Sequence, residues 1–379
     1  MARARLPHHR RGAVAAAVVA ATVAAAGLAG SSPAVAAPTA HAPAPAFRGE
    51  VVIPTGTQFK DTEVGGLSGI TYDRVRRVYY AVSDDRSEID PARFYTLRID
   101  VSDGRLDAGD VRVVGVTTLR QPDGTPFPAL SLDVESIALT PRRSLVITSE
   151  GDAGRDIDPF VREFSLSGRH LRSFPVPDRF LPEAGTRGVR TNLGFESAGV
   201  SPSGRSLFTA TEGALAQDGP AADLGVQSPA RLLRYDLRSG RLVREHVYLT
   251  DPVAEAPVPP TAFRVNGLVE LLPLSETRLL ALERSFSVGA GNTVKLYLVS
   301  LNRATDIRRV DSLDGLLDRV RPVRKHLLLD LDTLGIPLDN LEGITFGPRL
   351  PDGRQSLVMV SDNNFSPAAF TQVLLFALP

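Results

Sequence analysis

The chain has 379 residues, and its 43 lysines and arginines balance its 43 aspartates and glutamates. A formal net charge of zero gives no sign of a basic nucleic-acid-binding face or of a polybasic membrane anchor. The absence of cysteine excludes disulfides, zinc-thiolate sites and cysteine nucleophiles, and the absence of tryptophan excludes a carbohydrate platform of stacked indoles. The length exceeds that of a typical single domain, although large all-β folds reach it.

The first 36 residues predict a secretory signal peptide. Arginines between Arg3 and Arg11 precede an apolar run over residues 12–30, and Ala34-Val35-Ala36 fits the small-x-small cleavage pattern. We therefore expect a secreted protein with no stable membrane anchor after cleavage. The alternative is an uncleaved anchor, because the apolar run is nearly long enough to span a bilayer. The Arg10-Arg11 pair leaves open whether export follows the general secretory (Sec) route or the twin-arginine (Tat) route.

Residues 37–46 form a Pro/Ala-rich linker that cannot build a core, so we expect the folded domain over residues 47–379. Within this domain one pattern recurs five times: a short apolar strand, a turn rich in Pro, Gly or Arg, and a second apolar strand with an acidic end. The first strands are expected at residues 66–72, 134–139, 195–200, 266–271 and 341–346. A third alternating strand follows each copy, and a fourth follows the first four copies. Four antiparallel strands recurring every 60 to 75 residues, roughly, are typical of a β-propeller blade.

The two ends of this domain complement each other. The fifth copy lacks a fourth strand, and residues 47–53 form a strand with no hairpin partner. We expect this strand to pair with the last blade and close the ring, because closure removes exposed edges. The predicted fold is therefore an all-β propeller of five blades. Six blades is the alternative, since residues 326–331 form an unassigned strand, and only residues 313–320 suggest a short helix.

Acidic residues stand at two places in the repeat. The first strand of a blade lines the central channel and the second returns beside it, so the start of the first and the end of the second share one face. Three acids open first strands, namely Glu135, Glu196 and Glu342, and five close second strands, namely Asp84, Glu150, Glu212, Glu283 and Asp362. Converging carboxylates repel one another unless a cation, an arginine or a proton intervenes.

We therefore predict a divalent metal, calcium by preference, because an all-oxygen ligand set suits a hard ion. The predicted ligands are Glu135, Glu196, Glu342, Asp362, Asp84 and Glu283, helped by Asn192, Asn266 and Asn363. In a hydrolase the metal would polarise a substrate oxygen. Glu150 or Glu212 would then act as the general base, and Arg284 would neutralise negative charge on the substrate. Each acid taken alone also fits a structural ion pair.

Other catalytic motifs are missing from the sequence. There is no Gly-x-Ser-x-Gly elbow, no Gly-rich phosphate loop and no His-rich metal motif. Three histidines, His170, His246 and His326, lie within or beside outer strands, where we expect them on the surface.

Several segments resemble the phytase-like domain family, whose members are described as having esterase-like activity of phytase. They are Glu342-Gly343-Ile344-Thr345-Phe346, Pro351-Asp352-Gly353-Arg354 and Ser361-Asp362-Asn363-Asn364-Phe365, with further matches at residues 65–70, 133–136, 192–196 and 212–213. The resemblance covers residues 52–378. It implies a secreted bacterial propeller that acts on an ester or phosphoester.

Three hypotheses for the function follow. The first is a monomeric, metal-dependent hydrolase of a small-molecule ester or phosphoester, with no nucleic-acid partner. The second is a non-catalytic propeller that binds a ligand or a protein, and the third is a lactonase-like propeller that uses a similar metal centre on a cyclic ester.

Overall fold

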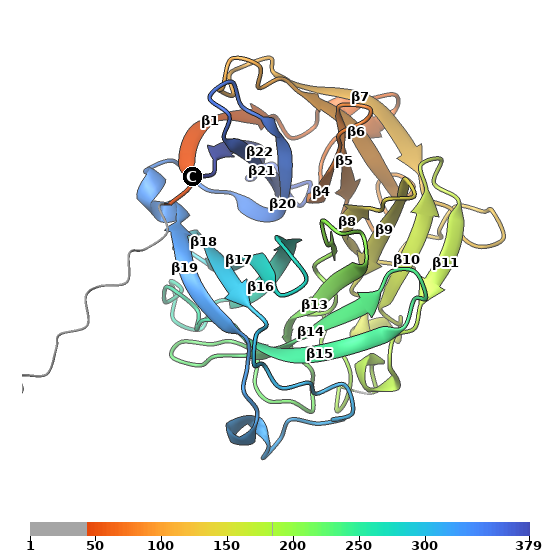
Figure 1. The fold of residues 1–379 in the computed structure, drawn as a ribbon, viewed down its shortest axis with the longest axis vertical. Helices are drawn as coiled ribbons and strands as arrows, with labels where there is room; N and C mark the ends of the chain where they lie inside the picture. Colours follow the sequence, from red (N-terminus) through yellow and green to blue (C-terminus); the bar gives the residue numbers. More distant parts are fainter. Residues whose placement is uncertain (1–43, 184) are drawn as a thin grey trace, which may run out of the picture. The chain divides into compact units, whose positions relative to one another are not determined.

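The computed structural model describes residues 44–183 and 185–379 (Figure 1). The predicted signal peptide, residues 1–36, and most of the predicted linker lie outside the described residues. The described chain forms five four-stranded antiparallel sheets and one two-stranded hairpin. The only helical segments in this part of the chain are short 3-10 turns: Ala153–Arg155, Asp178–Phe180, Leu317–Arg319 and Leu331–Leu334. The predicted all-β propeller of five blades is confirmed.

Each blade takes its strands in chain order from the channel outward, with one exception at the closing blade. Blade 1 holds β4 (Leu67–Asp73), β5 (Val78–Ser83), β6 (Arg93–Ile99) and β7 (Val111–Thr118). Blade 2 holds β8 (Val134–Leu139), β9 (Ser144–Ser149), β10 (Phe160–Ser165) and β11 (His170–Phe174). Blade 3 holds β12 (Gly199–Val200), β13 (Ser206–Ala214), β14 (Pro229–Asp236) and β15 (Leu242–Leu249). Blade 4 holds β16 (Arg264–Pro273), β17 (Arg278–Ser287), β18 (Gly291–Ser300) and β19 (Arg324–Asp330).

Blade 5 joins the two ends of the domain. It holds β20 (Asn340–Arg349), β21 (Gln355–Asp362) and β22 (Thr371–Ala377), and its outer strand is β1 (Ala46–Ile53), which pairs antiparallel with β22. The strand that suggested a sixth blade is β19, the outer strand of blade 4. The helix expected at residues 313–320 is reduced to the 3-10 turn Leu317–Arg319. The small hairpin consists of β2 (Gln58–Phe59) and β3 (Thr62–Glu63).

One buried apolar cluster fills each interface between neighbouring blades. The clusters depend on the two-residue period of a strand, because successive side chains point to opposite faces of the sheet. In β17, Leu279 and Ala281 pack toward blade 3, whereas Leu280 and Leu282 pack toward blade 5. The innermost strands also contact one another around the ring, from β4 through β8, β12, β16 and β20 back to β4. Each blade is therefore held on both faces, and the channel ends of its strands are fixed.

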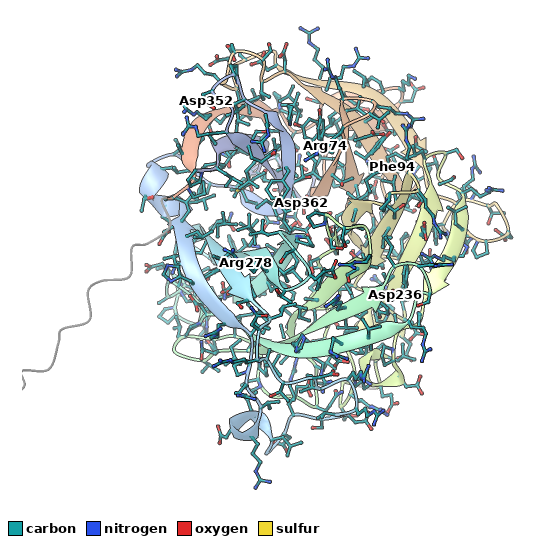
Figure 2. The ribbon with its side chains drawn as sticks, in the orientation of Figure 1. Arg74, Phe94, Asp236, Arg278, Asp352 and Asp362 are labelled. Atoms are coloured by element: carbon teal, nitrogen blue, oxygen red, sulfur yellow. The ribbon has the colours of Figure 1, made fainter. Side chains whose placement is uncertain are left out.

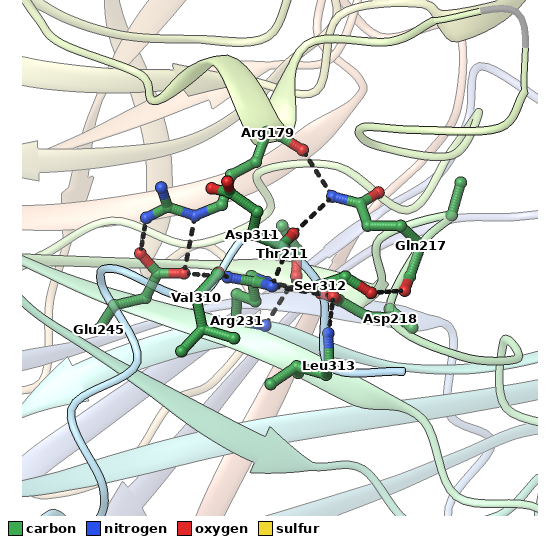
Figure 3. A network of polar contacts seen from close by, with 12 residues as sticks. Arg179, Thr211, Gln217, Asp218, Arg231, Glu245, Val310, Asp311, Ser312 and Leu313 are labelled. Atoms are coloured by element: carbon green, nitrogen blue, oxygen red, sulfur yellow. Dashed lines mark hydrogen bonds and ion pairs between the residues drawn. The ribbon is translucent and has the colours of Figure 1, made fainter. Parts of the chain in front are cut away.

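A buried ion-pair network attaches the long connection between β18 and β19 to blade 3 (Figure 3). Arg231 on β14 donates to Glu245 Oε1 at 2.6 Å and to Asp218 Oδ1 at 2.8 Å, and none of the three side chains is exposed. Arg179 also pairs with Glu245. The Asp218 carboxylate accepts from the backbone N–H of Leu313 at 2.9 Å, which fastens the connection.

Replacing Arg231 should therefore destabilise the fold strongly. Arg231→Ala leaves two carboxylates buried without their shared partner, and we expect a loss of about 3–5 kcal/mol in the free energy of unfolding, measured by urea denaturation. The matched control is Arg354→Ala, which removes an exposed pair with Asp352 and should cost less than about 1 kcal/mol. Equal losses for the two variants would contradict the structural role of the network.

Candidate functional site

The acids that open first strands stand on β-bulges. Register shifts interrupt the pairing of the first strand in four blades, between Leu67/Gly69, Val134/Ile137, Leu268/Glu270 and Leu341/Gly343. Glu135 and Glu342 lie inside these bulges, and Glu196 follows the isolated bridge of Phe195 with Thr211 in blade 3. A bulge bends the strand and re-aims the side chain at that point. The repeated bulge therefore turns the same position of several blades toward the channel.

The residues that close second strands face the next blade around the ring. Asp84, Glu150, Glu212 and Asp362 each follow a hydroxyl residue, Ser83, Ser149, Thr211 and Ser361 respectively. In blade 4 the corresponding pair is Glu283-Arg284, so Arg284 takes the position of the acids. The two-residue period then turns Glu283 the other way, toward blade 3.

The structure accordingly places Glu283 apart from the other predicted ligands. Its carboxylate accepts from Tyr248 Oη at 2.7 Å and from the backbone N–H of Asp251 at 2.8 Å, and it pairs with Lys325. Asn266 Nδ2 donates to the same carboxylate at 3.2 Å. These partners satisfy the Glu283 carboxylate, which links blades 3 and 4. Glu283 thus has the structural ion-pair role that each predicted acid could also have had.

The remaining acids share one cavity of about 870 Å³ at the mouth of the channel. Seven of the eight acids singled out from the sequence line it: Asp84, Glu135, Glu150, Glu196, Glu212, Glu342 and Asp362. Figure 2 labels Asp362 near the middle of the ring, whereas Asp236 and Asp352 lie toward its edge. All of the seven except Asp84 are nearly fully buried, with 2% to 6% of the residue surface exposed. The convergence expected from the repeat is present.

Burial and mutual repulsion make these carboxyl groups hard to ionise. Burial, the largest cause, raises the pKa of Glu150 to about 8. Burial also raises the pKa of Glu212 to about 7, although the charge of Arg284 lowers it. The pKa of Glu196 is raised well above its ordinary value by burial and then by the charges of Glu150 and Glu212. Asp362 has a raised pKa from burial and from Glu342. The cavity thus favours a proton or a metal cation.

Two overlapping groups of carboxylates have the spacing of a metal site. The oxygens of Asp84, Asp133 and Glu135 lie within 4.8 Å of one another, and so do those of Glu135, Glu150 and Glu196. Ligands at the calcium–oxygen distance of about 2.3–2.6 Å can be at most about 5 Å apart around one ion. Glu135 belongs to both groups. These residues could hold a divalent cation, and their all-oxygen chemistry suits a hard one.

Unpartnered oxygens support the same conclusion. Among the described residues, Asp84 Oδ1 and Glu212 Oε1 are buried without a hydrogen-bond partner. Arg284 Nη2 lies 3.6 Å from Glu212 Oε1, which is too far for a hydrogen bond. Buried acceptors without partners are rare and costly in native structures. A cation bound beside Asp84 would give Asp84 Oδ1 a partner, whereas Glu212 lies outside both carboxylate groups.

The two arginines of the cavity are already paired. Arg284 Nη2 donates to Glu342 Oε1 at 2.9 Å. Arg86 Nε donates to Asp133 Oδ1 at 2.8 Å, and Arg86 Nη1 lies 3.7 Å from Asp152 Oδ2. We predicted from the sequence that Arg284 neutralises charge on the substrate; in the structure its contacts are with the carboxylates of Glu212 and Glu342. Asp133 and Arg86 were missed as site residues, because Asp133 stands one position before the expected strand and the loop with Arg86 has no counterpart in other blades.

Two glycines leave room for acids of the preceding blade. A Cβ on Gly267 would lie 2.2 Å from Glu212 Cγ, and a Cβ on Gly194 would lie 2.9 Å from the Cβ of Glu150. The backbone N–H of Gly194 donates to Glu150 Oε1 at 2.6 Å. These contacts fix the two acids against the next blade.

Other predicted helpers have different places. Asn192 lines the cavity. Asn363 is fully buried and accepts from the backbone N–H of Gly66 at 2.9 Å, so its role is structural. His246 was expected on the surface, but the connection between β18 and β19 covers it, and its Nδ1 lies 2.9 Å from the carbonyl oxygen of Thr305.

A family model described as "Phytase-like: Esterase-like activity of phytase" matches residues 62–365, which hold all seven acids of the cavity. The chain belongs to this phytase-like family. The part of the chain that the structure describes has no helix with the length and apolarity that a membrane span requires.

Individual relatives are distant. An uncharacterized secreted protein of Arthroderma benhamiae is 22% identical over 273 residues, which span 54% of this chain and 53% of that protein. The chain thus spans about half the length of this relative. Among solved structures, the periplasmic gluconolactonase of Pseudomonas aeruginosa is 13% identical with a TM-score of 0.37, covering 84% of this chain and 90% of that chain. The Cps50 (Swd1) propeller domain of Myceliophteria thermophila is 13% identical with a TM-score of 0.34, covering 82% and 83%.

The raised pKa values predict a stability that depends on pH and metal. Between the ordinary carboxyl pKa of 4.5 and the raised values of about 8 for Glu150 and about 7 for Glu212, the folded state binds more protons than the unfolded chain. In chelator, the stability present at low pH should therefore be lost as pH rises through 7 and 8. Calcium should raise the melting temperature more at pH 8 than at pH 5.5, because ionised ligands bind it better.

Scanning calorimetry from pH 5 to 8.5, with chelator or with calcium, measures both effects. The double variant Glu150→Gln, Glu212→Gln should show a flatter pH profile in chelator than the unchanged protein. A melting temperature independent of pH, or a calcium effect equal at both pH values, would contradict the prediction.

Proposed function

We propose that the protein is an exported, metal-dependent hydrolase that acts on an ester or phosphoester in the acidic cavity. The observation that carries this proposal is the pair of overlapping carboxylate groups at the mouth of the channel, where Asp84 Oδ1 is buried without a hydrogen-bond partner. The family description, esterase-like activity of phytase, supports hydrolysis as the reaction class.

The residues divide into two roles. Glu135, Glu150 and Glu196, with Asp84 and Asp133 beside them, would hold a divalent cation of the calcium type. When bound, such an ion polarises a carbonyl or phosphoryl oxygen and stabilises the charge that develops on it.

Glu212 is the best placed general base. One of its oxygens has no hydrogen-bond partner, and the side chain lines the cavity. In this role it would take a proton from the attacking water. Arg284 lies between Glu212 and Glu342, at 3.6 and 2.9 Å, and favours the ionised form of both. We thus assign Arg284 a positioning role and Glu150 a metal-binding role.

Export from the cell belongs to the same function. Residues 1–36 have the composition of a signal peptide. The Arthroderma benhamiae relative is named as a secreted protein. A calcium site that binds weakly would be filled in extracellular fluid, where ligand affinities of about 0.1–1 mM suffice.

Assays of the purified mature protein test this function. Phosphomonoesters, phytate, short acyl esters and lactones are offered with calcium or with chelator. We expect turnover that chelator abolishes and calcium restores. Glu212→Gln should lower kcat by about 10²–10⁴-fold, the usual contribution of a general base, while calcium still raises the melting temperature. Glu196→Gln should weaken that calcium effect as well as turnover.

The matched control is Glu276→Gln, which alters an acid that pairs with Arg234 and does not line the cavity. It should keep wild-type kcat. Catalytic silence on every substrate, with calcium still raising the melting temperature, would overturn the hydrolase and leave a metal-dependent binding propeller. Turnover restricted to lactones would assign the cyclic-ester reaction.

A further inference from the structure

The cavity has an apolar wall in addition to its acids. Its larger apolar side chains include six that gather on one part of the lining: Ile89, Phe263, Val265, Phe286, Phe365 and Phe370. Ile89 comes from the β5–β6 loop, and Phe365 and Phe370 come from the β21–β22 loop. Val265 and Phe286 lie on β16 and β17, and Phe263 directly precedes β16. Isolated exposed apolar residues are common on proteins, but a group gathered around one cavity marks a binding site. We call these six residues the apolar wall.

The part of the wall on blade 4 is preorganised by contacts within the protein. Val265 and Phe286 are directly paired across β16 and β17, so their side chains share one face of the sheet. The rings of Phe263 and Phe286 lie 6.2 Å apart. Phe263 nevertheless leaves 64% of its surface exposed, and Ile89 leaves 52%. These two side chains pay a hydration cost that contact with an apolar ligand would remove.

The part of the wall on blade 5 is held in a strained backbone. Asn364 and Phe365 have φ angles of 47° and 50°, in the left-handed region that bulky residues rarely adopt. A Cβ on Gly66 would lie 2.8 Å from the Phe365 ring, so the ring packs closely on that glycine. Strain of this kind persists where the surroundings fix it, and it is concentrated at ligand sites.

The charges of the cavity argue against a polyanionic substrate. Within residues 44–183 and 185–379, no lysine lines it, and the two arginines that do are engaged by carboxylates, Arg284 by Glu342 and Arg86 by Asp133. Ionised carboxylates repel phosphate and protonated ones offer it no counter-charge, so a bound divalent cation would be the main positive charge open to a ligand. A ligand with many phosphates would therefore find no counter-charge for most of its groups. The cavity volume of about 870 Å³ suits a small organic molecule.

We infer that the apolar wall binds an aryl or alkyl group of the substrate, so that the substrate is an ester with one reacting group and a hydrophobic remainder, not a polyphosphate. This inference rests on the proposed hydrolase function, because it assigns the substrate class of the same cavity. Within the apolar wall, Phe263 is the most exposed residue, and we assign it the main role in substrate specificity.

Binding of non-hydrolysable phosphonates tests the inference separately from catalysis. Isothermal titration of the calcium-loaded protein with methyl-, propyl-, pentyl- and phenylphosphonate measures the preference for apolar groups. We expect the Kd to fall by about fourfold for each added methylene, which corresponds to its burial against the wall. Phytate should bind no more tightly than methylphosphonate.

Phe263→Ser should reduce the preference for phenyl- over methylphosphonate by about tenfold and leave the Kd for methylphosphonate unchanged. Val75→Ser is the matched control, because Val75 is 76% exposed and lies outside the cavity. The Val75→Ser protein should keep the wild-type preference for phenyl- over methylphosphonate. Unchanged melting temperatures show that both variants remain folded.

The outcomes separate the two proposals. Equal Kd values for all phosphonates, or tightest binding of phytate, would overturn the apolar wall and leave the metal site standing. Binding of phenylphosphonate that chelator does not weaken would overturn the metal site and leave the wall standing. Failure of every phosphonate to bind would overturn both.

Discussion

Repulsion between like charges held close together is the constraint on which this structure depends. Two carboxylates about 5 Å apart repel each other by about 3 kcal/mol at an effective dielectric constant of 20. A few such pairs approach the entire stability of a typical domain, about 5–15 kcal/mol. The acids of the cavity stay together because each innermost strand is packed between two neighbours and cannot retreat. The rigid ring thus holds together acids that would separate in a flexible chain.

The alternation of side chains along each strand builds the core and the site at once. Val358 and Val360 of β21 pack toward blade 1, and Asp362, two residues further on, continues the same face into the cavity. The same relation joins Phe208 and Ala210 to Glu212 in blade 3. The apolar part of each face holds the blades together, and its last residue delivers a carboxylate. Any slip of register by one residue would remove the acid from the cavity and a core residue from the interface.

The repeat made most of this predictable from the sequence. Five copies of one strand pattern indicated five blades and placed acids at equivalent ends, and the structure agrees for seven of the eight acids. Glu283 differs because a strand changes face at every residue, and Glu283 stands where the other blades have serine or threonine. Aligning Thr211-Glu212 with Glu283-Arg284 shows that Glu283 occupies the position of the hydroxyl residue and Arg284 the position of the acid.

Features outside the repeat could not be predicted in this way. Phe263 and Phe365 lie in loops with no counterpart in the other blades, so neither periodicity nor comparison between copies indicates where they point. The burial of His246 depends on the connection between β18 and β19, which crosses back over blade 3 and is fixed by Arg231 and Asp218. Such contacts arise from tertiary packing and leave no local pattern in the sequence.

Blade 4 contributes no acid to the cavity, yet it holds the acids of its neighbours in place. Arg284 contacts Glu212 of blade 3 and Glu342 of blade 5. Glu270 on β16 reaches across the channel, where its carboxylate accepts from Ser136 Oγ at 2.5 Å and from the backbone N–H of Ala198 at 3.0 Å.

Ser136 follows Glu135, and Ala198 lies two residues after Glu196, so Glu270 ties together the two bulged segments that carry these acids. An apolar residue at position 270 would leave the buried hydroxyl of Ser136 without its acceptor, and the N–H of Ala198 with Ser136 Oγ alone. Blade 4 therefore supplies both the guanidinium of Arg284, which lies among the carboxylates, and the carboxyl group of Glu270, which lies behind them. Carboxylates that are oriented from behind in this way keep their free oxygens directed at the cavity.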